Sequence, residues 1–219
     1  MLVLAHRGYH AGLPENTLAA FEAAQRLGVD GIETDVRLSV DGKPVIMHDR
    51  VTPAGRAVSA ITHREIEDDC GHAVPLLAEI FDAAPALLWN IEIKRPEAWP
   101  VAAPILKQFQ KTRRILVSSF RHDVVYQCAA QLEVDCALLI ASRPLDVDAI
   151  MAGCAAQPRI QSIVWDYNII DEKILQAVTA RGWNNYVYGA HTPDEHAYCG
   201  TLHLRGLITD HPQRAGGGR

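Results

Sequence analysis

Short apolar segments alternate with longer amphipathic segments along most of the chain. The apolar segments predict eight strands, at Leu2–His6, Gly31–Val36, Leu87–Lys94, Ile115–Phe120, Ala137–Ala141, Ser162–Tyr167, Tyr186–Ala190 and Gly206–Asp210. Helical spacing predicts helices at 17–28, 76–84, 98–111, 122–131, 145–154, 171–181 and 193–200. This alternation is typical of βα units around a parallel sheet, so the pattern predicts an α/β protein with a TIM (β/α)₈ barrel.

One further strand candidate, Pro44–His48, does not fit this alternation. It follows Asp41-Gly42, which is a two-residue hairpin signal, so we predict a β-hairpin extension after the second strand. With Asp41 and Gly42 as the loop, Asp35 would lie opposite His48. That register would return His48 to the level of Glu33 and Asp35 at the barrel mouth.

Length and composition favour one folded domain. The chain has 219 residues, and roughly 200 already suffice for a complete barrel of this kind. Hydrophobic residues make up 48% of the chain and charged residues 21%, which is typical of a globular protein. We therefore predict a single domain over residues 1–214 and a flexible, glycine-rich tail over 215–219.

Charge and cysteine content exclude several classes of partner. A net charge of −5 without a basic stripe argues against nucleic acid, and no apolar stretch has the roughly 20 residues of a membrane span, so no stable membrane insertion is expected. The five cysteines are scattered and odd in number, which indicates reduced structural thiols of a cytoplasmic protein. Met1–Ala5 is too short for a signal peptide, in agreement with that location.

Acidic side chains gather at the predicted strand ends. Glu33 and Asp35 share one strand face, and Asn90, Glu92 and Lys94 share another. Carboxylates inside a parallel barrel are costly unless they are paired or bind a cation. Glu33, Asp35 and Glu92 therefore predict an oxygen-ligand site for one divalent ion, Mg²⁺ or Ca²⁺, with Mn²⁺ possible.

Two histidines stand at the same level of the predicted barrel. His6 ends the first strand and His48 ends the hairpin strand. Histidine accepts and donates protons near neutral pH, so the two could act on opposite sides of a phosphodiester as catalytic base and acid. The other eight histidines are more simply explained as surface or hydrogen-bonding residues.

Four more residues are candidates for binding a substrate. Arg7 and Lys94 suit a phosphoryl oxygen, although they could instead serve only to neutralise the carboxylates. Strand alternation points Arg7 away from His6, so its side chain reaches the site only if the chain bends there. Phe120 and Tyr188 could form aromatic walls of the site or belong to the core.

Several of these residues lie in longer motifs. The motifs are Ala5-His6-Arg7-Gly8, Pro14-Glu15-Asn16-Thr17, Gly31-Ile32-Glu33-Thr34-Asp35-Val36, Asp41-Gly42-x-Pro44-Val45-x-x-His48-Asp49 and Asn90-Ile91-Glu92-Ile93-Lys94. In order and spacing they resemble the glycerophosphodiester phosphodiesterase family. Weaker similarity at Val74-Pro75-Leu76, Ser118-Ser119-Phe120 and Gly206-Leu207-Ile208-Thr209-Asp210-x-Pro212 extends the resemblance over nearly the whole chain.

The resemblance implies a TIM barrel that hydrolyses small anionic glycerophosphodiesters, such as glycerophosphocholine or glycerophosphoethanolamine, to sn-glycerol 3-phosphate and an alcohol. It implies Glu33, Asp35 and Glu92 as metal ligands and His6 and His48 as the acid–base pair. It also implies attack by the substrate's own glycerol hydroxyl, through a cyclic phosphate that water then opens.

The chain departs from the family pattern at two places. Only 24 residues separate Asp49 from Val74, which resembles a small bacterial-type member with a short insertion and implies a reduced pocket roof. Tyr188-Gly189-Ala190-His191 stands where the family usually has a Trp-Thr-Val-Asn-like run.

Three other functions are compatible with the pattern. One is a phospholipase D-like activity on lysophospholipids or sphingomyelin, which needs apolar surface at the barrel mouth. Another is a non-catalytic barrel that binds glycerophosphodiesters, and the third is a metal-dependent aldolase or isomerase, favoured by fold analogy alone. The sequence leaves open the metal ion, the headgroup and the oligomeric state.

Overall fold

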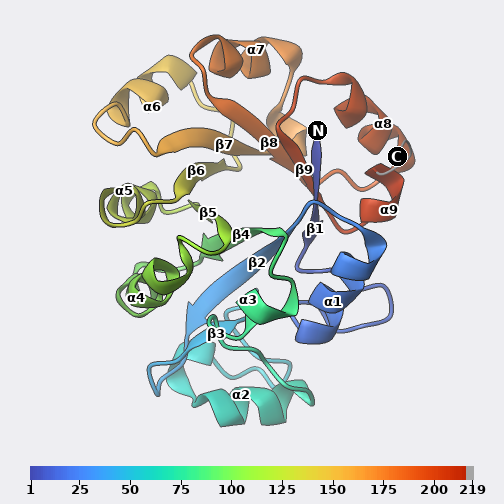
Figure 1. The fold of residues 1–219 in the computed structure, drawn as a ribbon, viewed down its shortest axis with the longest axis vertical. Coiled ribbons are helices and arrows are strands. Elements are labelled where there is room, and N and C mark those ends of the chain that lie inside the picture. The colour runs from blue at the N-terminus through green and yellow to red at the C-terminus, as the bar shows by residue number, and fades with distance from the viewer. Residues whose placement is uncertain (216–219) are drawn as a thin grey trace.

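The computed structural model describes residues 1–215 and contains a closed barrel of parallel strands (Figure 1). Its strands are β1 (Leu2–His6), β2 (Gly31–Leu38), β4 (Leu88–Ile93), β5 (Arg114–Ser119), β6 (Asp135–Ile140), β7 (Ile160–Asp166), β8 (Asn184–Tyr188) and β9 (Gly206–Thr209). Because β1 pairs in parallel with both β2 and β9, the sheet has no open edge in the barrel. The predicted TIM barrel is confirmed, and its strand ends lie within two residues of those expected.

Helices lie around the barrel and in the segment beside it (Figure 1). They are α1 (Leu18–Leu27), α2 (His63–Cys70), α3 (Ile80–Ala83), α4 (Trp99–Phe109), α5 (His122–Gln131), α6 (Val147–Gly153), α7 (Glu172–Ala180), α8 (Pro193–Thr201) and α9 (Pro212–Ala215), with 3₁₀ turns η1 (Val58–Ala60), η2 (Pro96–Ala98) and η3 (Tyr167–Ile169). Within residues 1–215, no helix has the length and apolar character needed to cross a membrane. Ala215, expected in the flexible tail, is the last residue of α9, and residues 216–219 of that prediction lie outside the described part of the chain.

Each face of the barrel sheet carries an apolar layer, one outside the barrel and one inside it, because side chains on a strand alternate between the two faces. Trp89, Ile91 and Ile93 of β4 belong to the larger core between strands and helices. Leu88 of the same strand faces inward and belongs to a second cluster that fills the barrel floor. Gly31 of β2 meets this floor so closely that a Cβ atom there would lie 2.6 Å from the Leu88 carbonyl oxygen. Above the floor, the inward positions become polar.

The hairpin after β2 is present, but its predicted register is wrong. β3 (Pro44–Ile46) runs antiparallel to β2, with Leu38 paired to Pro44 and Val36 to Ile46. The Met47 amide, and not that of His48, donates to the Asp35 carbonyl oxygen at 3.0 Å. The loop has three residues and ends at Gly42, whose φ of 75° is the left-handed conformation that three-residue hairpin loops use at their last position.

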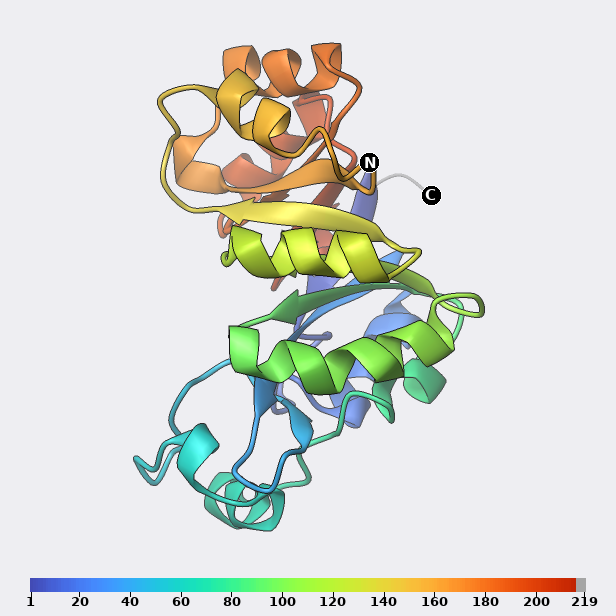
Figure 2. The same cartoon turned by 90° about the vertical axis from the view of Figure 1, so that its left-hand side faces the viewer.

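The segment between β3 and β4 forms a small subdomain beside the barrel (Figures 1 and 2). It has its own cluster of buried residues, Val45, Val58, Ile61, Ile66 and Val74. Helix α2 within it was not predicted, because Ile66 is its one buried residue and gives no apolar period. Its sequence signal was instead the capping box of Thr62 and Glu65.

The helix predicted at 76–84 is also shorter than expected. Leu76 pairs in an antiparallel bridge with Val45, and the Leu77 amide donates to the Pro44 carbonyl oxygen at 2.9 Å. These backbone bonds extend the hairpin sheet and delay the start of α3 to Ile80.

Candidate active site

Strand register places three carboxylates together at the C-terminal mouth of the barrel. β2 and β4 pair so that Asp35 lies beside Glu92 and Glu33 beside Asn90. Glu33, Asp35 and Glu92 each offer an oxygen within 4.8 Å of the others. Their exposed fractions are 4%, 1% and 6%, so the cluster lies almost entirely out of solvent. The alternation that placed these side chains on shared strand faces therefore also places them in one cluster.

Two cations partly balance this cluster. Lys94 Nζ lies 2.8 Å from both Asp35 Oδ1 and Glu92 Oε2, and Arg7 Nε lies 3.4 Å from Asp35 Oδ2. Burial works to raise the pKa of Asp35, but the charges of Lys94 and Arg7 outweigh it and lower that pKa. Asp35 is therefore the carboxylate that the protein's own cations hold ionised.

The charged forms of Glu33 and Glu92 are less stabilised than that of Asp35. Burial, reinforced by the neighbouring Asp35 and Glu92, raises the pKa of Glu33 well above its usual value. Burial also raises the pKa of Glu92, to about 7. Glu33 Oε2 is buried without a hydrogen-bond partner among the described residues. An all-oxygen set with an unsatisfied buried acceptor fits a hard divalent ion such as Mg²⁺ or Ca²⁺.

Arg7 reaches the site because the chain turns at the end of β1. Its φ of 56° is left-handed, which redirects a side chain that continued alternation would point away from His6. Arg7 Nη1 lies 3.0 Å from both carboxylate oxygens of Glu15, so the guanidinium is held between Glu15 and Asp35. The bend required for Arg7 to reach the mouth is thus present.

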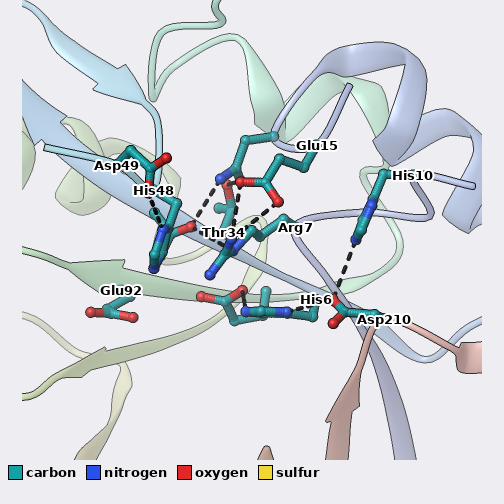
Figure 3. A network of polar contacts seen from close by, with 12 residues as sticks. His6, Arg7, His10, Glu15, Thr34, His48, Asp49, Glu92 and Asp210 are labelled. Carbon is teal, nitrogen blue, oxygen red and sulfur yellow. Dashed lines mark hydrogen bonds and ion pairs between the residues drawn. The ribbon is translucent and has the colours of Figure 1, made fainter. Parts of the chain in front are cut away.

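His6 is held in place by Asp210, which directly follows β9. Its Nδ1 lies 2.6 Å from Asp210 Oδ1, and its Nε2 lies 3.7 Å from Glu33 Oε2 (Figure 3). His10 Nε2 lies 3.3 Å from the same Asp210 oxygen. Burial works to raise the pKa of Asp210, but the hydrogen bonds from His10 and His6 outweigh it and hold that pKa well below its usual range. Asp210 therefore stays ionised, which favours a proton on His6 Nδ1 and leaves Nε2 to face the carboxylates.

His48 reaches the same cavity from the hairpin. Its Nδ1 lies 2.9 Å from Asp49 Oδ1, and its backbone carbonyl accepts hydrogen bonds from Arg37 Nε and Nη2 at 2.8 and 2.5 Å. Burial lowers the pKa of His48, although the charge of Asp35 opposes this. Figure 3 shows His6 and His48 on either side of Arg7. Despite the different register, His48 lies at the mouth because it follows the last paired residues of β3.

All but one of the residues predicted for the site line one open cavity, with an empty volume of about 540 Å³. They are His6, Arg7, Glu33, His48, Glu92, Lys94, Phe120 and Tyr188. Asp35 lies behind this surface, in contact with Lys94. Phe120 is 45% exposed and meets Tyr188 edge to face, with ring centroids 6.2 Å apart. These two aromatic rings form one wall of the cavity mouth.

The sequence reasoning missed two supporting residues. Asp210 was treated only as part of the last strand, although closure of β9 on β1 places it beside His6. Asn16 was considered as part of the Pro14-Glu15-Asn16-Thr17 motif, but its Nδ2 donates to Asp35 Oδ2 at 2.9 Å, while Thr17 caps α1. The position of Asp210 could have been predicted, because the first and last strands of a closed barrel are neighbours and their ends meet. No local signal existed for Asn16, because its contacts are with residues distant in the sequence.

A closed parallel barrel whose C-terminal mouth joins buried acids, histidines and cations is a TIM barrel of the enzyme class, with its candidate active site at the face where such barrels carry theirs. The chain belongs to the glycerophosphoryl diester phosphodiesterase family, which it matches over residues 6–214. This confirms the resemblance seen in the motifs.

Individual relatives agree with this family. A glycerophosphodiester phosphodiesterase of Caldanaerobacter subterraneus subsp. tengcongensis is 37% identical over 142 residues, which cover 55% of this chain and 58% of that protein. The match thus spans little more than half of that relative. The uncharacterized protein YqiK of Bacillus subtilis is 29% identical over 238 residues and covers 97% of this chain and 96% of its own length.

Solved structures show the same fold. The glycerophosphodiester phosphodiesterase of Thermotoga maritima superposes with a TM-score of 0.83 at 27% identity, covering 97% of this chain and 96% of that one. An Oleispira antarctica phosphodiesterase, solved with the product sn-glycerol-3-phosphate, has a TM-score of 0.87 at 21% identity and covers 98% and 95% of the two chains. At that identity the second likeness concerns the fold alone.

Proposed function

We propose that the protein is a metal-dependent phosphodiesterase that hydrolyses glycerophosphodiesters, such as glycerophosphocholine and glycerophosphoethanolamine, to sn-glycerol 3-phosphate and an alcohol. The observation that carries the proposal is the buried cluster of Glu33, Asp35 and Glu92 at the barrel mouth, where Glu33 and Glu92 line the same cavity as His6 and His48. Family membership supports it, as do the relatives named for this activity. The small cavity, with Arg7 and Lys94 in its lining, suits a compact anionic substrate.

In this proposal Glu33, Asp35 and Glu92 hold one divalent ion, Mg²⁺ or Ca²⁺, with Mn²⁺ possible. Such an ion lowers the pKa of a bound hydroxyl and offsets negative charge as phosphorus is attacked. Lys94 forms ion pairs with two of these carboxylates, Asp35 and Glu92, and so holds their side chains in position. Its positive charge lies at the barrel mouth. Arg7, held by Glu15, presents its guanidinium to a phosphoryl oxygen.

The histidines would move the protons. One of His6 and His48 takes the proton of the substrate's free glycerol hydroxyl, which attacks phosphorus and forms a cyclic phosphate. The other histidine gives its proton to the departing alkoxide. In the second step the roles reverse, since the histidine left without a proton accepts one from water and the other returns its proton to the glycerol oxygen as the ring opens. Asp210 and Asp49 orient the two rings.

A cytoplasmic location is part of the proposal. The five cysteines are all free, and burial raises the pKa of Cys136 to about 12. Thiols kept protonated in this way are poor nucleophiles, which agrees with a structural role in a reducing compartment.

Removal and return of metal tests the function. After treatment with a chelator, the protein is expected to release no glycerol 3-phosphate from glycerophosphocholine, and Mg²⁺, Ca²⁺ or Mn²⁺ should restore release. The measurement is an enzymatic assay of glycerol 3-phosphate against each added ion. Absence of product with every ion and with several headgroups would refute the proposal.

A lysophospholipid is the second candidate substrate, and one observation favours it. Phe120 and Tyr188 place apolar surface at the cavity mouth, where an acyl chain would need it. Glycerophosphocholine and lysophosphatidylcholine should therefore be offered to the same preparation. Cleavage of the lysolipid alone would replace the small-substrate assignment by a phospholipase D-like one.

Asp210→Asn is expected to lower kcat by about 10- to 100-fold with little change in KM. The substitution keeps the size of the side chain but removes the charge that fixes a proton on His6 Nδ1. Steady-state kinetics with glycerophosphocholine separate kcat from KM. Asp135→Asn, at the exposed opposite end of the barrel, is the matched control and should change neither. An Asp210→Asn enzyme with native kcat would remove Asp210 from the mechanism.

A further inference from the structure

A second cavity adjoins the first on the side of the hairpin, and Lys94 lines both. Its empty volume is about 1480 Å³, against about 540 Å³ for the first. Its walls come from the end of β2, from the segment after β3 and from the turn after β4, so it opens at the barrel mouth. We call it the arginine cavity, after Arg37, Arg50 and Arg95 in its lining.

The charge of this lining is opposite to that of the whole chain. Four of its twelve residues are basic and one, Glu97, is acidic, whereas the chain carries a net charge of −5. Lys94 is committed to Asp35 and Glu92, and Arg95 Nε lies 3.7 Å from Glu97. Within the described residues, Arg37 and Arg50 form no ion pair with a carboxylate. The cavity therefore holds two guanidinium groups without a carboxylate at ion-pair distance, although the charges of Asp35, Glu92 and Asp49 act on Arg37 from further away.

Arg37 lies two residues beyond Asp35 on β2. It is on the same face of β2 as Glu33 and Asp35, and strand geometry places its Cα about 6.6 Å beyond that of Asp35. The hydrogen bonds from Nε and Nη2 to the His48 carbonyl fix the guanidinium but do not neutralise it, and they leave Nη1 for another partner. A half-buried guanidinium without a carboxylate in direct contact is costly to desolvate, and an anionic ligand that contacts it would offset this cost.

We infer that the arginine cavity receives the headgroup of the substrate and selects headgroups that carry an additional anionic group. The inference rests on the proposed function, because a phosphate held beside Lys94 and Arg7 has the arginine cavity as its neighbour across Lys94. The alcohol substituent of such a substrate would extend past Lys94 from the first cavity into the arginine cavity. There it would contact Arg37 first, and then Arg50 and Arg95. A carboxylate or a second phosphate on that substituent would pair with these guanidinium groups.

Glycerophosphoserine and glycerophosphoethanolamine provide the test, since they differ by a single carboxylate. The native enzyme is expected to show a kcat/KM about tenfold higher for glycerophosphoserine, which is the effect of one charge-assisted hydrogen bond. Arg37→Gln and Arg50→Gln should each bring the ratio of the two kcat/KM values toward one. The ratio is an internal control, because Arg37→Gln also disturbs the carbonyl of His48 and lowers both rates.

Arg114→Gln is the matched control, since Arg114 is exposed at the opposite end of the barrel, at the start of β5. It should leave the ratio unchanged. Equal kcat/KM values for the two diesters in the native enzyme would overturn the inference and leave the proposed function standing. A preference that survives both Arg37→Gln and Arg50→Gln would also overturn it. Turnover of neither diester would refute the proposed function and the inference with it.

Discussion

Glu33→Gln is expected to lower kcat/KM for glycerophosphocholine by about a thousandfold, which corresponds to about 4 kcal/mol of lost transition-state stabilisation. The substitution replaces an oxygen of the proposed metal site by an amide nitrogen and removes the charge, while the size of the side chain stays the same. Glu33 Oε2 has no hydrogen-bond partner among residues 1–215, so few protein contacts are lost.

Stability should change in the opposite sense to activity. Burial raises the pKa of Glu33, which means that its charged form is destabilised in the metal-free protein. Glu33→Gln removes this cost, so the metal-free variant should melt at a temperature equal to or above that of the native protein. The native protein should gain about 5 to 10 °C in Tm at an ion concentration a hundred times Kd, and the variant should gain none.

Two measurements decide this prediction: thermal unfolding with chelator or added ion, and steady-state kinetics. Glu172→Gln, at an exposed position in the first turn of α7, is the control and should retain both activity and the metal-induced rise in Tm. If Glu33→Gln kept the rise in Tm, Glu33 would not be a metal ligand.

His6→Ala and His48→Ala are each expected to reduce kcat by about 10²- to 10⁴-fold, the range for loss of a general acid or base. Neither ring contributes to the apolar core, so far-UV circular dichroism should remain native. The metal-induced rise in Tm should also persist, because the three carboxylates remain. This combination distinguishes loss of proton transfer from loss of the metal site.

His203→Ala is the matched control, since His203 is exposed in the segment before β9. Its kcat should equal that of the native enzyme. Native turnover in His6→Ala or His48→Ala would exclude the affected histidine from the chemistry.

Most of the barrel could be predicted from the sequence because its signals are local. Each strand is a short apolar run, and each long helix has a buried stripe at helical spacing. Where the signal was weak the prediction failed: α2 has one buried residue and was missed, and the start of α3 is displaced by the bonds that Leu77 and Pro44 form. These errors fall in the small subdomain, where buried residues are few and backbone pairing to β3 sets the start of α3.

The hairpin after β2 shows that a loop one residue longer than predicted changes the pairing of its strands. Asp41-Gly42 indicated the turn correctly, but the three-residue loop pairs Asp35 with Met47 and not with His48. No local pattern separates these two loops, because both place Gly42 in a left-handed conformation. His48 still reaches the mouth, so its position depends on the chain beyond β3 and on the Arg37 contact to its carbonyl.

By itself, the sequence determined the strands and the helices that alternate with them, a pattern typical of a barrel of this class. It also determined the shared strand faces of Glu33 with Asp35 and of Asn90 with Glu92, because side chains on a strand alternate with period two. Only the tertiary structure decided which further side chains join these strand faces at the barrel mouth. The left-handed turn at Arg7 and the closure that sets Asp210 beside His6 follow from pairing between distant segments. Such pairing depends on the packing of the whole barrel, and a local pattern does not contain it.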